Sequence, residues 1–355
     1  MRVFGKLNYL IISVGIALSL STGLLANGPL DATGGCDCNP TQVIVQLLNS
    51  GDLPAVITQY GLEPTPAAQV GSPAVFLLKI NQNVPNPPTP PQVVTAMTGD
   101  ARISFAEVNR KLSQVETEGL AWTQGHSWAI GHSWAIGGSV KGLQFQWFPQ
   151  RIHLNEAFAA AGTKGLRSDN GQPIVVAVLD TGIELTHPAF AGRLVDVADR
   201  WDFVDGDNDP SEVGILRTDS AFGHGTHVAG IVAQMVPDAK IMPLRVLDRD
   251  GSGELWRITA ALIWAANHGA DVANLSLGYP QDVRLLHDLL DNLDPGTIPP
   301  ATTFPELGTH RLAVAVAAGN GGNTTPVFPA AEQRDGMLSV AASTRYDGLA
   351  NFASY

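Results

Sequence analysis

The sequence is poor in cysteine and in positive charge. Its 355 residues include two cysteines, Cys36 and Cys38, which are too few for a disulfide framework or a zinc site made of four thiolates. Lysine and arginine number 21 against 33 aspartates and glutamates, so the net charge is −12. Proteins that bind nucleic acid generally need basic patches to hold phosphates, and this balance argues against nucleic acid as a partner.

Long apolar runs are also scarce. The one candidate follows Arg2 and Lys6 and covers residues 9–25, which predicts a secretory signal peptide at residues 1–26. The alternative is an uncleaved anchor, because the run is long for a signal peptide and marginal for a membrane span. No other segment reaches spanning length. We therefore expect a secreted, extracellular protein that contacts no membrane after signal cleavage.

The remaining sequence has the texture of an α/β protein. Apolar strands and short helices alternate over residues 40–113, which predicts a small α+β module with strands at 43–48, 74–80 and 101–108. Beyond residue 150 the apolar runs are nearly continuous and are separated by helix-like stretches such as 255–267. Such runs are typical of a mostly parallel, doubly wound sheet buried on both faces.

A segment at residues 114–149 separates these two regions and contains the sequence HSWAIG twice in succession, at 126–131 and 132–137. In a strand, the His, Trp and Ile side chains would share one face. The two histidines would then stand about 20 Å apart, too far to share one metal ion. The repeat is therefore interpreted as part of an extended linker.

Three polar residues could carry chemistry. Asp180 ends one apolar strand, His224 precedes a predicted helix, and Asn320 ends another strand. Each alone has an ordinary explanation, as a turn residue or an exposed histidine. Because active sites gather at the carboxyl ends of parallel strands, the three together favour an acyl-transfer site with a base, its orienting acid and an oxyanion donor.

Five motifs then identify a family. VAVLDTGIELTHP, GHGTHVAGIVA, VLDRDGSGELW, NLSLG and AAGNGG follow one another in the order seen in subtilisin-like serine proteases, the subtilases, over residues 150–355. The resemblance implies that Asp180 orients His224, that His224 is the general base, and that Asn320 donates to the oxyanion. It also implies two strand edges for an extended polypeptide substrate and a pocket for one side chain: Gly251, Ser252, Gly253, Ser276, Leu277, Gly278, Ala317, Ala318 and Gly319.

The layout of residues 40–113 likewise resembles the inhibitor-like propeptide of this family, which implies an intramolecular inhibitor. Two features depart from the family pattern. No Gly-Thr-Ser segment occurs, so the nucleophile serine is absent, the peptidase domain is expected to be incomplete at its carboxyl end, and the chain as written is expected to be inactive. A noncatalytic peptide-binding protein and an inhibitor acting in trans are the alternatives.

The second departure concerns calcium. Ala189 stands where many relatives have an aspartate ligand, so their common tight calcium site is not expected. The acidic stretch after Trp201 instead resembles a calcium loop of some thermostable relatives, which implies a structural calcium ion, although a solvated acidic loop is an equal alternative. No cofactor is expected for the chemistry. The implied ligands are Asp202, Asp205, Asp207 and Asp209.

Overall fold

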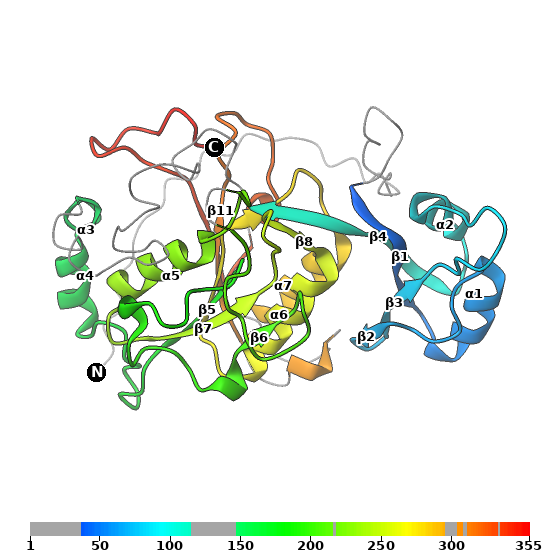
Figure 1. Ribbon diagram of the computed structural model, residues 1–355, viewed down its shortest axis with the longest axis horizontal. Helices are drawn as coiled ribbons and strands as arrows, with labels where there is room; N and C mark the ends of the chain where they lie inside the picture. Colours follow the sequence, from blue (N-terminus) through cyan, green and yellow to red (C-terminus); the bar gives the residue numbers. More distant parts are fainter. Residues whose placement is uncertain (1–36, 115–146, 216–217, 295–303, 308–310, 333) are drawn as a thin grey trace, which may run out of the picture.

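The computed structural model describes residues 37–114, 147–215, 218–294, 304–307, 311–332 and 334–355. The expected signal peptide and the HSWAIG repeat lie outside these ranges. Two sheets organise the described chain (Figure 1). We call residues 37–114 the amino-terminal module and residues 147–355 the parallel-sheet region. Among the described helices, none is both long and apolar enough to cross a bilayer.

The parallel sheet of this region has six strands in the order β12-β11-β9-β5-β7-β6. Every neighbouring pair runs parallel, which confirms the predicted sheet. The continuous apolar runs of the sequence supply five of the six strands. Their bounds are β5 (Val175–Asp180), β6 (Trp201–Asp202), β7 (Lys240–Arg245), β9 (Val272–Leu275), β11 (Ala313–Ala317) and β12 (Met337–Val340).

Helices cover both faces of this sheet, as the apolar strands require. Helix α5 (His224–Met235) lies on one face, and α6 (Leu255–Asn267) and α7 (Arg284–Leu293) lie on the other (Figure 1). Alternate residues of β5 serve the two sides: Val178 packs in a cluster with α5, whereas Leu179 packs in the cluster that contains α6. Two further helices, α3 (Phe148–Arg151) and α4 (Leu154–Ala161), precede β5.

The amino-terminal module is an antiparallel sheet with two helices. Val43 and Val45 point to one side and pack with the helices, whereas Ile44 points to the other side and joins the core of the parallel-sheet region. The sheet of the module is thus buried on both faces, on one side by its own helices and on the other by the parallel-sheet region. Its elements are β1 (Cys38–Leu47), α1 (Leu53–Tyr60), β2 (Ala68–Val70), β3 (Val75–Lys79), α2 (Pro90–Met97) and β4 (Ile103–Gln114).

Strand β4 is longer than predicted and leaves its own module. We expected a strand ending at residue 108, but β4 continues to Gln114. Its last residues pair antiparallel with β8 (Ser252–Glu254) on one side and β10 (Leu277–Gly278) on the other. The residues after 108 do not alternate between apolar and polar, so the sequence does not predict a strand there. They are extended because they pair with β8 and β10, which are distant in sequence.

Two side chains of β4 also bind helix starts in the parallel-sheet region. Glu107 accepts the backbone N–H groups of Arg284 and Leu285, the first residues of α7, at 3.1 and 3.0 Å. Asn109 Oδ1 accepts the N–H of Trp256 in the first turn of α6, at 3.1 Å. These N–H groups lack partners within their helices, so β4 caps both helices while it crosses them.

Candidate active site

The buried pair Asp180 and His224 forms the centre of the site. Asp180 is the last residue of β5 and His224 is the first residue of α5. Both side chains are almost fully buried, and His224 Nδ1 donates to Asp180 Oδ1 at 2.6 Å. The same oxygen accepts the N–H of Thr181 at 2.7 Å. Asp180 thereby holds the imidazole in one orientation, with Nε2 as the nitrogen that can accept a proton.

The close approach of β5 and α5 depends on Gly225. A Cβ atom added at Gly225 would lie 2.1 Å from the carbonyl oxygen of Gly182 and 3.0 Å from Asp180 Cβ. No side chain fits at those distances. The glycine after His224 therefore lets the start of the helix pack directly on the turn that follows Asp180.

Glu212 is a residue of this site that the sequence interpretation missed. Its Oε1 accepts the N–H of Thr226 at 3.0 Å and the hydroxyl of Thr181 at 3.2 Å, and its Oε2 accepts the N–H of Gly223 at 3.0 Å. The Thr181 hydroxyl in turn accepts the N–H of Gly225 at 2.9 Å. Glu212 thus ties the turn after Asp180 to the start of the His224 helix. Burial of the carboxyl raises the pKa of Glu212 to about 8.

Strand β4 lies where the sequence places an extended polypeptide. Leu112 and Ser113 pair with Gly253 and Ser252 of β8, and Ser113 also pairs with Gly278 of β10. A Cβ atom at Gly253 would lie 2.6 Å from the carbonyl oxygen of Val246, so the tight path of β8 requires glycine. The two edges expected to hold a peptide therefore hold a strand of the same chain.

A pocket of about 280 Å³ opens beside this strand. Ser113, Gly278, Gly319 and Asn320 are among its lining residues, whereas Ala317 and Ala318, expected in its wall, are not. Ala317 instead ends β11, and Ala318 donates its N–H to Val340. The structure thus brings Asn320 and the β10 edge together around one hollow.

Ser354 also lines this pocket, although the sequence did not single it out as a site residue. Its Oγ accepts the N–H of Gly321 at 3.1 Å, and its own N–H donates to the carbonyl of Gly319 at 2.9 Å. These two bonds hold the loop on either side of Asn320. We interpret Ser354 as a support for that loop.

Two other predicted peptide-binding residues lie in connections. Gly251 is in the turn before β8, where its N–H donates to Asp248 O at 2.9 Å. Ser276 lies between β9 and β10, and its Oγ accepts the side-chain amide of Asn274 at 3.1 Å. Both residues flank the paired edges without belonging to the ladder with β4.

In the acidic loop after Trp201, the two carboxylates closest to the core pair with an arginine. Asp202 Oδ2 and Asp205 Oδ2 both accept from Arg245 Nη1 at 2.6 Å, and the Asp202 side chain is almost fully buried in that contact. Asp207 Oδ1 accepts the N–H of Asp209, and Asp209 Oδ1 accepts the Ser211 hydroxyl. An arginine thus neutralises the carboxylates closest to the core. The calcium site stays a prediction that these contacts do not favour.

Comparison with known proteins decides the family. The model of the subtilase family matches residues 171–355, just over half of the chain. The chain belongs to the subtilase family. This confirms the resemblance drawn from the five motifs, and the parallel sheet with helices on both faces agrees with it.

This subtilase is 35% identical over 222 residues to the thermophilic serine proteinase of Bacillus sp. (strain AK1) and 31% identical over 221 residues to thermitase of Thermoactinomyces vulgaris. Each alignment covers 59% of this chain, and the chain spans 47% and 66% of the two relatives. Fervidolysin from Fervidobacterium pennivorans has a similar fold, with a TM-score of 0.59 at 22% identity over 89% of this chain and 46% of that chain.

We expect Gly225→Ala to lower the free energy of unfolding of the subtilase by about 1–3 kcal/mol, because the new methyl group must displace the Gly182 carbonyl. Urea denaturation measures this loss. The short His224 to Asp180 hydrogen bond should give the unsubstituted protein a downfield NMR resonance for the Nδ1 proton, and the variant should lose it. Gly348→Ala is the control, since its Cβ would meet only Thr344 Oγ1 at 3.4 Å. A Gly225→Ala protein that keeps both its stability and the downfield resonance would contradict this packing.

Glu212→Gln should reduce the pH dependence of stability. The pKa of Glu212 is about 8 in the folded protein against an ordinary 4.5. Between these values the folded state holds a proton that the unfolded state has lost, so the free energy of unfolding falls as pH rises. One such proton accounts for about 1.4 kcal/mol per pH unit. Glutamine does not titrate, so the variant should lose that part of the slope.

The measurement is urea denaturation at several pH values between 5 and 8, with Asp238→Asn, which removes an exposed carboxyl, as the control. An unchanged slope in Glu212→Gln would show that this carboxyl does not take up a proton on folding.

Proposed function

We propose that this subtilase is a secreted serine endopeptidase in zymogen form. The observation that carries the proposal is strand β4, an extended polypeptide paired on both edges beside the pocket that contains Asn320. Substrates of such a site bind as an added strand, with backbone hydrogen bonds for affinity and pockets for side chains. The geometry of β4 therefore supports an extended polypeptide as the substrate class.

The proposed chemistry is acyl transfer. His224 accepts the proton of the attacking hydroxyl at Nε2 and returns it to the leaving amine, while Asp180 stabilises the imidazolium. Asn320 donates to the negative charge that develops on the carbonyl oxygen. The 355 residues contain no Gly-Thr-Ser segment, and no serine among them is assigned as the nucleophile.

We infer that residues 40–113 are the propeptide and inhibit the site from within the chain. Four contacts, one of them from Asn39 just before this range, support this beyond the pairing of β4. Glu107 and Asn109 cap α7 and α6, and Asn39 and Asn109 both donate to Glu254, at 3.1 and 3.0 Å, at the end of β8. The module is thus anchored on both sides of the proposed cleft, with Ser113 at its centre.

Export is proposed from the residue pattern of 1–26. The apolar run follows two basic residues and precedes small residues, the order of a secretory signal peptide. Localisation outside the cell agrees with a protease kept inhibited until its propeptide is removed.

A noncatalytic peptide-binding protein is the second candidate. It is favoured by one observation, the strand edges of β8 and β10, which hold an extended strand. Such a protein would bind peptides between β8 and β10 without cleaving them. Cleavage and binding therefore separate the two candidates.

The test is hydrolysis of an extended fluorogenic peptide by the full gene product after its maturation. We expect turnover, and we expect His224→Ala to reduce it by about 10⁶-fold, the scale known for the catalytic histidine of subtilisin, a member of this family. His153→Asn, at an exposed histidine, should keep full activity. Equal activity in His224→Ala, or peptide binding without turnover in the unsubstituted protein, would contradict the protease proposal.

A further inference from the structure

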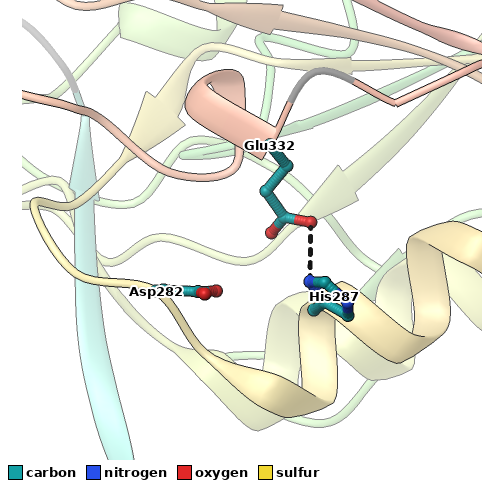
Figure 2. Close-up of side chains that lie close together, drawn as sticks. All are labelled: Asp282, His287 and Glu332. Atoms are coloured by element: carbon teal, nitrogen blue, oxygen red, sulfur yellow. Dashed lines mark ion pairs between the residues drawn. The ribbon is translucent and has the colours of Figure 1, made fainter. Parts of the chain in front are cut away.

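Three side chains outside the proposed active site converge at the start of α7. Asp282 precedes the helix, His287 lies in its first turns, and Glu332 comes from the short helix η7 (Ala330–Glu332) that follows β11. One ligand atom of each lies within 4.8 Å of the other two. Figure 2 shows the Glu332 carboxylate pointing into the space between Asp282 and His287.

One carboxylate oxygen of the buried Glu332 lacks a hydrogen-bond partner among the described residues. Its side chain is 3% exposed, and its Oε2 accepts from Arg334 Nε at 3.0 Å and lies 3.5 Å from His287 Nδ1. Its Oε1 is buried and has no hydrogen-bond partner within the described part of the chain. A buried polar atom in that state costs about 1–3 kcal/mol or more. Burial accordingly raises the pKa of Glu332 to about 8, and Asp282 and Asp288 add to the effect.

The donor set matches one class of ion. Imidazole nitrogen and carboxylate oxygen are ligands that zinc accepts at about 2.0–2.2 Å, whereas calcium and magnesium prefer oxygen ligands alone. Two ligands of a tetrahedral zinc ion at those distances stand roughly 3.3–3.6 Å apart. The separation of 3.5 Å between His287 Nδ1 and Glu332 Oε2 agrees with that spacing.

We propose that Asp282, His287 and Glu332 bind a zinc ion, with water in the fourth position. The ion would lie beside the buried Glu332 carboxylate, whose Oε1 has no hydrogen-bond partner among the described residues, and would bring the exposed Asp282 against the helix. This site is separate from the Asp180 and His224 pair, and the proposal does not depend on the protease function.

Arg334 is the competitor of the ion. Its Nη2 lies 2.6 Å from His287 Nδ1, its Nε binds Glu332, and its Nη1 pairs with Asp291. The guanidinium thus supplies the positive charge in the metal-free arrangement. Zinc must displace the guanidinium from His287 and Glu332. The displaced guanidinium can keep its ion pair with Asp291. Removing this charge should therefore strengthen zinc binding.

The ion would join two segments that border the proposed cleft. Tyr279, shortly before Asp282, and Phe328, shortly before Glu332, exchange backbone hydrogen bonds of 3.1 and 2.8 Å. Tyr279 and Val327 both line the pocket that contains Asn320. A zinc ion would thus link the two segments that carry these lining residues and limit their movement relative to each other.

The test is calorimetric titration of the chelator-treated protein with zinc chloride, with cobalt(II) absorption as a second probe of tetrahedral geometry. We expect one site that His287→Ala and Glu332→Gln each weaken by more than tenfold, since losing even an outer-shell partner costs about 10–100-fold. Arg334→Gln should tighten binding several-fold. Asp238→Asn removes an exposed carboxyl that follows α5 on the other face of the sheet, and it should leave the affinity unchanged.

Circular dichroism confirms that each variant is folded before titration. Unchanged zinc affinity in both His287→Ala and Glu332→Gln would overturn the proposal, since the ion would then be held elsewhere. The absence of zinc binding by the folded unsubstituted protein, or preference of this cluster for calcium over zinc, would also overturn it.

Discussion

The pairing of β4 with two strands at once is the contact on which the described arrangement depends. Strand β8 has three residues and β10 has two, and each gains its ladder partner from β4. Short edges of this kind present unpaired N–H and C=O groups when the central strand is removed. The same property that makes them dependent on β4 makes them suited to another extended polypeptide.

The amino-terminal module adds contacts that make β4 a specific occupant. Glu107 and Asn109 reach the starts of two helices, and Ile44 on the neighbouring strand joins the main core. An ordinary substrate peptide offers the strand but not the helix caps or the apolar face. The module can therefore hold the cleft more firmly than a peptide that pairs only through its backbone. The proposed inhibition and the attachment of the module would then depend on the same interface.

Much of the fold could be predicted because its cause is local. The continuous apolar runs predict the buried parallel strands, and the helix predicted over 255–267 is α6. The turn after Asp180 and the helix start at His224 also follow from neighbouring residues. What could not be predicted depends on contacts distant in sequence. The extension of β4 beyond residue 108 needs β8 and β10, and the role of Glu212 needs the turn at Thr181 to be close in space.

Arg245 shows that a contact distant in sequence can also change the interpretation of a local pattern. Four aspartates close in sequence resemble a cation loop, but an arginine at the end of β7 reaches two of them. Conversely, Asp282, His287 and Glu332 are spread over about fifty residues and carry no motif, and only the fold brings them together.

The most direct test of the account is whether β4 blocks the peptide site. A labelled peptide that copies residues 110–114 would be titrated against the protein before and after proteolytic excision of the amino-terminal module. Excision should convert no detectable binding into saturable binding at the β8 and β10 edges. Equal binding before and after excision would show that β4 does not occupy the peptide cleft.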